Sequence, residues 1–286
     1  MRFRITFQLG QSRRLPVDYQ YFAGAWIYRV IRQADREYAR FLHDHGFTDG
    51  NKVFKLFAYS PLQLDGYQLL RNEGVFEVGG HGVAMKVAFH LPDTAEKFII
   101  GLFNRQQLFL GDRRSGLDLT VSAVERLPEP RFSRQMSYRL TSPAVFSIRS
   151  EGDRHPRYLE PENAGYPELV YNHLLQKMKV AGLAEPLLPA GELQMHLDGN
   201  WKSKLIRIRQ ETPQQTRVRG FLYNFTLDAP EAFHRLVYNA GFGEKNASGF
   251  GWTEITPAAE SDRRGTGEWS ASRNNEATPE QQMKDN

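Results

Sequence analysis

A glycine-rich run near the end of the chain carries the residues best suited to bind a phosphate. Residues 239–252 contain a single lysine, Lys245, and four glycines: Gly241, Gly243, Gly249 and Gly251. Glycine tolerates positive φ and lets other backbones approach closely, so this run can curl with several N–H groups pointing inward. The chemistry that the run predicts is phosphate or RNA binding by backbone N–H groups and one ammonium.

The order of the flanking elements excludes two better-known glycine motifs. An apolar helix-like run at 233–240 precedes the glycines, and a strand-like run at 250–255 follows them. A Walker loop and a dinucleotide fingerprint both need a strand before the glycines and a helix after them. The alternative to phosphate binding is a long, flexible connection between helix and strand. The charge and the aromatic residues of the chain favour phosphate or RNA contact.

Basic residues gather in a second region, upstream of the glycines. Arg207 and Arg209 alternate with Ile206 and Ile208, so in a strand one face would be charged while the other face packs. We expect Arg207, Arg209 and the nearby Lys204 to contact RNA from a hairpin. An ordinary solvated hairpin is the alternative.

The eight histidines and the absence of cysteine limit the remaining chemistry. A chain without cysteine has no disulfide framework and no thiol nucleophile. His43 and His45 lie at the end of a helix-like run, where the helix dipole favours a cation. The other six show no metal-ligand spacing and are interpreted as structural or surface residues: His81, His90, His155, His173, His196 and His234. We therefore expect neither a metal site nor a cofactor.

The composition is that of a globular protein. The 286 residues are 40% hydrophobic and 12% aromatic, which is ample for a buried core. A formal net charge of +4 permits a nucleic-acid partner without requiring one. No signal peptide and no run of membrane-spanning length is visible, so we expect a cytoplasmic protein without a membrane partner.

Periodicity in the first half predicts the order β-α-β-β-α-β. Residues 1–9 alternate polar and apolar side chains as an amphipathic strand does, with Arg2 on the polar face. Helical spacing follows at 21–33, and Asp35 can cap a second short helix. The remaining expected elements are a strand at 52–64 broken at Pro61, a hairpin-like pair at 74–91, a helix to about residue 104 and a strand at 117–127.

The second half repeats this order, and the simplest architecture is α+β with two tandem ferredoxin-like (RRM-like) domains. The expected elements are a strand at 137–148, a helix at 162–181, strands at 193–197, 204–210 and 217–227, a helix at 230–240 and a strand at 250–255. The predicted domains are 1–130 and 131–257, and the glycine-rich loop belongs to the second. Residues 258–286 are nearly free of aliphatic side chains, which predicts a disordered tail.

The glycine loop and the tandem order together resemble the CRISPR-associated repeat-RNA endoribonucleases of the Cas6 family. The most specific part is residues 241–251, supported by the opening strand, by residues 28–61 and by residues 142–145 at the start of the second domain. The resemblance implies an enzyme that cleaves CRISPR precursor RNA within its repeats to release guide RNAs. It further implies cleavage without a metal, by 2′-OH attack that leaves a 5′-hydroxyl and a 2′,3′-cyclic phosphate.

The same resemblance implies the catalytic residues. Some family members use a tyrosine, a histidine and a lysine, which fall here at Tyr28 of the first helix, His43 after the second helix and Lys55 at the opening of the next strand. Histidine suits proton transfer near neutral pH, lysine can stabilise charge on the phosphoryl oxygens, and tyrosine can orient the attacking hydroxyl or donate to the leaving group. Whether His43 or His45 is the acid or base is left open.

Two other functions compete with this interpretation. One is a non-catalytic subunit that holds repeat RNA in a CRISPR effector complex, and the other is a ferredoxin-like module for an acidic protein or a small ligand. The expected partner is CRISPR repeat RNA. Association with other effector-complex subunits, and the choice between monomer and homodimer, stay open.

Overall fold

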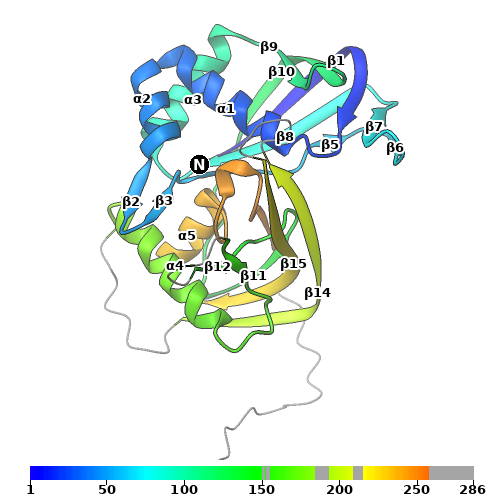
Figure 1. Ribbon diagram of the computed structural model, residues 1–286. Helices are drawn as coiled ribbons and strands as arrows, with labels where there is room; N and C mark the ends of the chain where they lie inside the picture. Colours follow the sequence, from blue (N-terminus) through cyan, green and yellow to red (C-terminus); the bar gives the residue numbers. More distant parts are fainter. Residues whose placement is uncertain (150–151, 153–154, 184–192, 209–214, 258–286) are drawn as a thin grey trace, which may run out of the picture.

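The computed structural model describes residues 1–149, 152, 155–183, 193–208 and 215–257 of the chain. They form two units, each a sheet with helices, which lie one above the other in Figure 1. The expected tail at 258–286 lies outside the described residues. No helix within the described part of the chain is long and apolar enough to cross a membrane.

The first unit is built on a sheet with the central order β4-β8-β1-β10-β9. These strands are β1 (Arg2–Pro16), β4 (Phe57–Tyr59), β8 (Gly82–Phe89), β9 (Gln107–Gly111) and β10 (Gly116–Leu127). Three short strands extend the sheet, namely β5 (Gln63–Leu64), β6 (Tyr67–Leu70) and β7 (Val75–Val78). The two long helices are α1 (Gln20–Ala34) and α3 (Pro92–Asn104).

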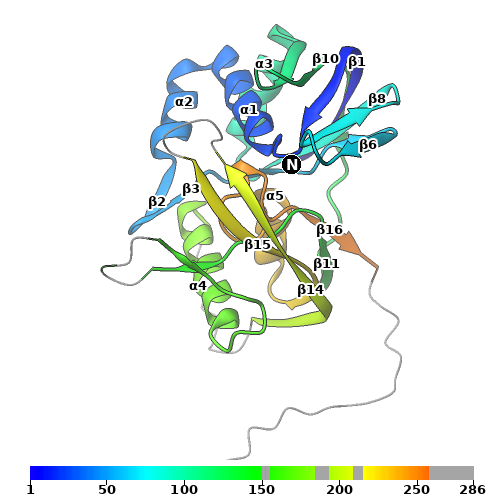
Figure 2. The ribbon, with the colours of Figure 1, turned by 45° about the vertical axis from the view of Figure 1, so that its right-hand side comes forward.

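The alternation along β1 explains how the helices attach. Phe3, Ile5 and Phe7 are buried on one face of the strand. The Phe7 ring packs edge-on against Trp26 of α1, with centroids 5.6 Å apart, and Trp26 packs in the same way on Phe98 of α3 at 5.9 Å. Burying large apolar side chains is the main stabilising contribution here, at about 1.5–3 kcal/mol for each fully buried one. Both helices therefore cover the same face, as Figure 2 shows.

The second unit repeats the topology of the first. Its sheet order is β14-β15-β11-β16, formed by β11 (Gln135–Leu140), β14 (Gln194–Ile208), β15 (Thr216–Asp228) and β16 (Thr253–Thr256). The helices are α4 (Tyr166–Val180) and α5 (Glu231–Ala240). In both units the first strand lies between the third and the fourth, with the second strand outside the third. The predicted tandem of ferredoxin-like domains is confirmed.

Four expected strands have different boundaries in the structure. The strand expected at 52–64 is broken after β3 (Lys52–Phe54), where Leu56 adopts a positive φ of 54°. The strands expected at 193–197 and 204–210 are one strand, β14, with a register shift between Asp198 and Lys202. The strand expected to reach residue 148 ends at Leu140, because the chain then turns and the Ala144 N–H donates to Phe221 O at 2.8 Å.

Short elements fill the connection between α1 and β4 and the connection between β11 and α4. Helix α2 (Arg36–Arg40) leads into a single π-helical turn, Phe41–His45, and then into β2 (Phe47–Asp49). The expected cap is confirmed, since Asp35 Oδ1 accepts the Tyr38 N–H at 2.9 Å. Strands β12 (Ser147–Ile148) and β13 (Arg157–Tyr158) form a separate small pair.

A buried arginine joins the two units. Arg2 was expected on the solvated face of the first strand, but its side chain is only 2% exposed. Its guanidinium donates to Tyr238 O at 2.6 and 2.9 Å and to Thr253 O at 2.9 Å, and it lies over the Tyr238 and Trp252 rings. The correction has a simple cause: the second unit covers this end of β1, so a polar side chain there must find partners within the protein.

Candidate active site

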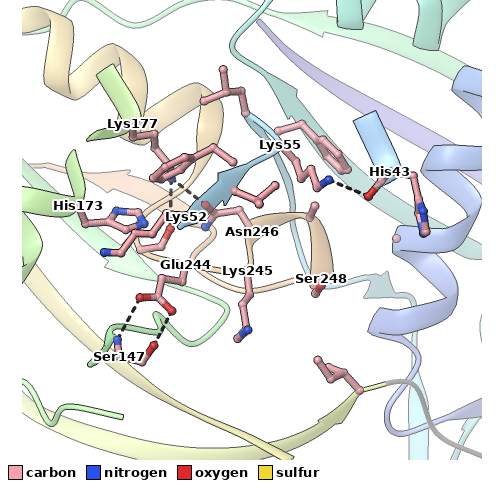
Figure 3. Close-up of a pocket in the computed structure, with 18 of the residues that line it drawn as sticks. His43, Lys52, Lys55, Ser147, His173, Lys177, Glu244, Lys245, Asn246 and Ser248 are labelled. Carbon is pink, nitrogen blue, oxygen red and sulfur yellow. Dashed lines mark hydrogen bonds between the residues drawn. The ribbon is translucent and has the colours of Figure 1, made fainter. Parts of the chain in front are cut away.

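A cleft of about 1290 Å³ lies where the two units meet. The first unit contributes α1, the π-helical turn and the segment from β3 to β4. The second unit contributes α4 and the glycine-rich loop. Figure 3 shows the side chains that line it, among them His43, Lys55, His173, Lys245 and Ser248.

The π-helical turn presents His43 to this cleft. Gly46 ends the turn with a φ of 65°, and its N–H donates to Phe41 O at 2.7 Å. The His43 side chain is 63% exposed, and its Nδ1 lies 2.8 Å from Asp44 Oδ1. That hydrogen bond lowers the pKa of Asp44, so the carboxylate is ionised and can only accept. The neutral imidazole therefore carries its proton on Nδ1 and presents Nε2 as a base.

Tyr28 of α1 lies beside this histidine. Its ring packs edge-on against His43, with centroids 5.1 Å apart, and against Phe57 at 5.4 Å. Burial raises the pKa of Tyr28 above its usual value, so the phenol stays protonated at neutral pH. A protonated phenol next to an imidazole can donate a hydrogen bond to a substrate oxygen.

Lys55 completes this wall of the cleft from the break between β3 and β4. Its Nζ donates to the backbone oxygen of His43 at 2.7 Å, which ties the two residues together (Figure 3). Partial burial lowers the pKa of Lys55 to about 8, opposed by the Asp44 carboxylate. The structure thus gathers Tyr28, His43 and Lys55, which lie in three different elements, on one surface. His45 is exposed but does not line the cleft.

The glycine-rich loop has the predicted backbone but different hydrogen bonding. Gly241, Gly243, Gly249 and Gly251 all have positive φ, between 69° and 88°, and Gly241 ends α5 as expected. However, five N–H groups of the loop donate to carbonyl oxygens of the protein. The donors are the N–H groups of Phe242, Glu244, Ser248, Gly249 and Gly251. These five groups cannot serve as the inward-pointing phosphate cradle that the sequence suggested. The loop is mostly buried because it packs between the two units.

One cation of the loop remains at the surface. Lys245 is exposed and lines the cleft, and its own φ of 58° is a left-handed conformation that few lysines adopt. It precedes a short 3₁₀ turn, Asn246–Ser248, which packs against α1 and β4. Gly24 of α1 makes room for this turn, since a Cβ there would lie 2.8 Å from Ala247 O. The loop thus contributes a side chain to the cleft, and its glycines contribute the shape.

The basic hairpin reaches the cleft at Ile208, but Lys204 and Arg207 do not line it. Ile206 is buried and Arg207 is exposed, as the alternation predicted, and Lys204 is exposed as well. Arg207 Nε lies 3.1 Å from Asp18 Oδ2 of the first unit, so this arginine also joins the two units. Arg209 lies outside the described residues.

The sequence interpretation missed Lys177. It lies on α4, four residues after His173, and is 2% exposed in the core of the second unit beside the cleft. A signal was present, because Val170, Leu174 and Met178 mark the apolar stripe of this helix and Lys177 lies within that stripe. Burial lowers the pKa of Lys177 to about 7, opposed by Glu244.

No group of three or more histidine, aspartate or glutamate side chains is placed to hold a metal ion, within the part of the chain that the structure describes. The side chains that line the cleft include an imidazole base, a protonated phenol and the ammonium groups of Lys52, Lys55, Lys177 and Lys245.

Comparisons with known proteins place both halves of the chain in one family. The family model of the N-terminal part of CRISPR-associated protein Cas6 matches residues 14–124, and that of the C-terminal part matches residues 127–255. A CRISPR-associated endoribonuclease Cas6 of Methanocaldococcus jannaschii is 24% identical over 259 residues, which cover 88% of this chain and 91% of the relative. The endoribonuclease Cas6 of Pyrococcus furiosus is 22% identical over 264 residues, with 89% and 90% covered.

A solved structure shows the same fold. The structure described as a Cas6-related gene product of Pyrococcus furiosus superposes with a TM-score of 0.74 at 18% identity, covering 91% of this chain and 99% of that one. At this identity the likeness concerns the fold alone.

Proposed function

Because the chain belongs to the Cas6 family, we propose that it is an endoribonuclease that cleaves CRISPR precursor RNA within its repeats to release guide RNAs. Its two named relatives are CRISPR-associated endoribonucleases that align over about nine-tenths of their own length, at 91% and 90%. The observation that carries the proposal is the gathering of Tyr28, His43 and Lys55 on one wall of a cleft with Lys245 nearby.

The proposed reaction is an internal displacement at phosphorus. The ribose 2′-oxygen loses its proton and bonds to the adjacent phosphorus, the bond from phosphorus to the 5′-oxygen breaks, and that oxygen gains a proton. The products are a 2′,3′-cyclic phosphate and a 5′-hydroxyl, and neither water nor a metal is consumed. His43 Nε2 takes the first proton or, when protonated, supplies the second, which typically contributes about 10²- to 10⁴-fold in rate.

The neighbouring groups have complementary roles in this proposal. The Lys55 ammonium stabilises the extra negative charge on the phosphoryl oxygens, since donors at the position where charge develops lower the barrier most. Tyr28 orients the attacking hydroxyl or donates to the leaving oxygen. Holding the nucleotide in line for attack supplies much of the remaining acceleration.

The second unit would hold the RNA. Lys245 is an exposed cation of this unit at the cleft, and the exposed Lys204 and Arg207 extend the positive surface along β14. The proposal also assigns RNA binding to Arg209, which lies outside the described residues. Gly241, Gly243, Gly249 and Gly251 act in this proposal through the shape of the loop. We assign residues 1–130 to a catalytic domain and 131–257 to an RNA-holding domain, in a protein that meets its transcript in the cytoplasm.

The test compares His43→Ala with His45→Ala on repeat RNA. We expect His43→Ala to slow single-turnover cleavage by about 10²- to 10⁴-fold with repeat binding close to that of the wild type. His45→Ala is the matched control, because this imidazole is two residues away and does not line the cleft, and it should change the rate much less. Equal losses in both variants would contradict the assignment of His43.

Two further arms of this experiment examine the nucleophile and the metal. A repeat with one 2′-deoxy nucleotide just upstream of the cut should bind but resist cleavage, because the attacking oxygen is gone. A chelator should leave the wild-type rate unchanged. Cleavage of the deoxy substrate at the same bond would point to an activated water. Binding of repeat RNA without any cleavage would instead favour a non-catalytic subunit of an effector complex.

A further inference from the structure

The buried ammonium of Lys177 is bonded to the glycine-rich loop and not to a carboxylate. Its Nζ donates to Gly241 O at 2.8 Å, to Gly243 O at 3.2 Å and to Asn246 Oδ1 at 2.8 Å (Figure 3). A fourth oxygen, Ala240 O, lies at 3.4 Å, so the three protons of the ammonium all have acceptors. A buried charge is costly unless it is fully hydrogen-bonded, so its presence in this core calls for a reason beyond packing.

The loop explains why a cation is needed at this place. Gly241 and Gly243 have positive φ, near 79° and 78°, and their carbonyl oxygens accept from the buried Lys177 ammonium, so both oxygens face the core. Such oxygens would be unpaired if an apolar side chain replaced Lys177, and each unpaired buried acceptor is costly. The lysine and the unusual backbone of the loop therefore depend on each other.

Asn246 extends the hydrogen bonds of Lys177 across the loop, and we call this pair of side chains, Lys177 and Asn246, the brace. Its Oδ1 accepts from Lys177, while its Nδ2 donates to Phe242 O at 3.3 Å and to Phe250 O at 3.0 Å. One side chain thereby connects both arms of the loop to the ammonium. The residue immediately before it, Lys245, is the exposed cation at the cleft.

We propose that Lys177 is a positioning residue for RNA binding, which acts through Asn246 and the loop carbonyls to hold Lys245 at the cleft. The proposal rests on the proposed function, because it assigns Lys245 to a phosphate of the repeat. Lys177 itself touches no RNA: its Nζ is enclosed by the loop. Replacing Lys177 should therefore weaken RNA binding as much as removing the Lys245 ammonium does.

The experiment is a double-mutant cycle on repeat-RNA affinity, with Lys177→Met, Lys245→Met and the double variant. Each single variant should raise Kd by about tenfold, and the double variant should also raise it by about tenfold, because both changes remove the same interaction with phosphate. The matched control is Lys179→Met, two residues along the same helix, where the side chain is 60% exposed and pairs with Asp49. Its Kd should stay near that of the wild type.

Salt dependence gives a readout that a merely structural lysine would not change. Removing one ion pair with a phosphate should reduce the slope of log Kd against log salt concentration by about 0.7 to 0.9. We expect this reduction in Lys245→Met and, although its lysine is buried, equally in Lys177→Met. An unchanged slope in Lys177→Met, or a hundredfold rise of Kd in the double variant, would overturn the proposal.

A variant that cannot fold does not end the test. If Lys177→Met is insoluble, Asn246→Ala removes the other half of the brace and keeps the lysine, and it should show the same reduced slope. An unchanged slope in that variant would also overturn the proposal. If the wild type cleaves repeat RNA while Lys177→Met and Asn246→Ala both bind it with the wild-type Kd, the role of Lys177 is overturned and the proposed function stands. A wild type without affinity for repeat RNA would overturn the proposed function as well.

Discussion

The chemistry of the cleft depends on how each ionisable side chain is held. Asp44 fixes the tautomer of His43, so that Nε2 is the ring nitrogen available for proton transfer. Lys55 is held by the backbone oxygen of the same histidine, and Tyr28 packs against its ring. These residues are therefore positioned relative to one another before any RNA arrives, which is the condition for rapid reaction of a bound phosphate.

At this scale the structure predicts an alkaline limit to activity. The pKa of Lys55 is lowered to about 8, so the free enzyme loses this positive charge as the pH rises through that value. If the charge stabilises the phosphoryl oxygens, kcat/KM for repeat RNA should fall above about pH 8, because this ratio reports groups of the free enzyme. The measurement is a pH profile of cleavage.

Lys55→Arg is the matched variant for this profile. A guanidinium stays charged throughout the accessible range, so the fall above pH 8 should disappear even if the maximal rate is lower. An identical alkaline fall in Lys55→Arg would assign the titration to another group.

Among the elements, the glycine-rich loop both packs the second unit against the first and lines the cleft. It packs against α1 and β4 of the first unit, and several of its N–H groups are paired within the protein. A Cβ at Gly243 would lie 2.6 Å from Val145 O and 3.1 Å from the Phe146 ring. The glycines are thus required by close packing as well as by positive φ.

We therefore predict that Gly243→Val lowers both thermal stability and RNA affinity. Gly74→Val is the matched control, because Gly74 also has a positive φ, of 66°, but nothing lies within 4 Å of a Cβ there. In the control only the left-handed backbone conformation of the new valine lowers the free energy of unfolding, by roughly 1–2 kcal/mol. Its RNA affinity should stay that of the wild type. Thermal melts and binding titrations of both variants measure the difference, and equal behaviour would mean that packing around Gly243 is unimportant.

Across the molecule, the cleft exists because two similar units are fixed against each other. Arg2 of the first strand reaches the backbone of Tyr238 and Thr253 near the other end of the chain, and Trp252 packs with Ala58 and Ala88. This contact determines how the catalytic wall faces the loop. Arg2 is consequently far more important than its place in an amphipathic strand suggests.

Replacing this arginine should destabilise the protein measurably. Arg2→Met leaves two buried carbonyl oxygens without their donors, each costing about 1–3 kcal/mol, so we expect a loss of roughly 2–6 kcal/mol in the free energy of unfolding. Arg4→Met is the matched control, since Arg4 is on the same strand face but exposed, and its effect should stay within about 0.5 kcal/mol. Denaturant titration measures both, and similar values would contradict a joining role for Arg2.

Local signals in the sequence were enough to predict the order of the elements. Alternation along residues 1–9, the Asp35 cap and the glycine that ends α5 are such signals, and they act within a few residues of where they are read. Two rounds of β-α-β-β-α-β follow from them, and the family resemblance then placed His43.

Which polar groups are buried depended on contacts between segments that are far apart in the chain. In the sequence Arg2 looks like an ordinary solvated residue, Lys177 is a cation within an apolar helix stripe, and the glycine loop looks like an open phosphate cradle. Their partners lie far along the chain, at Tyr238 for Arg2 and at Gly241 for Lys177. Periodicity reports which face of one element is apolar, but it cannot report which polar face a second domain will cover. The second unit covers Arg2 of the first. Packing within the second unit itself pairs the N–H groups of the glycine loop, encloses Lys177 and leaves Lys245 at the cleft.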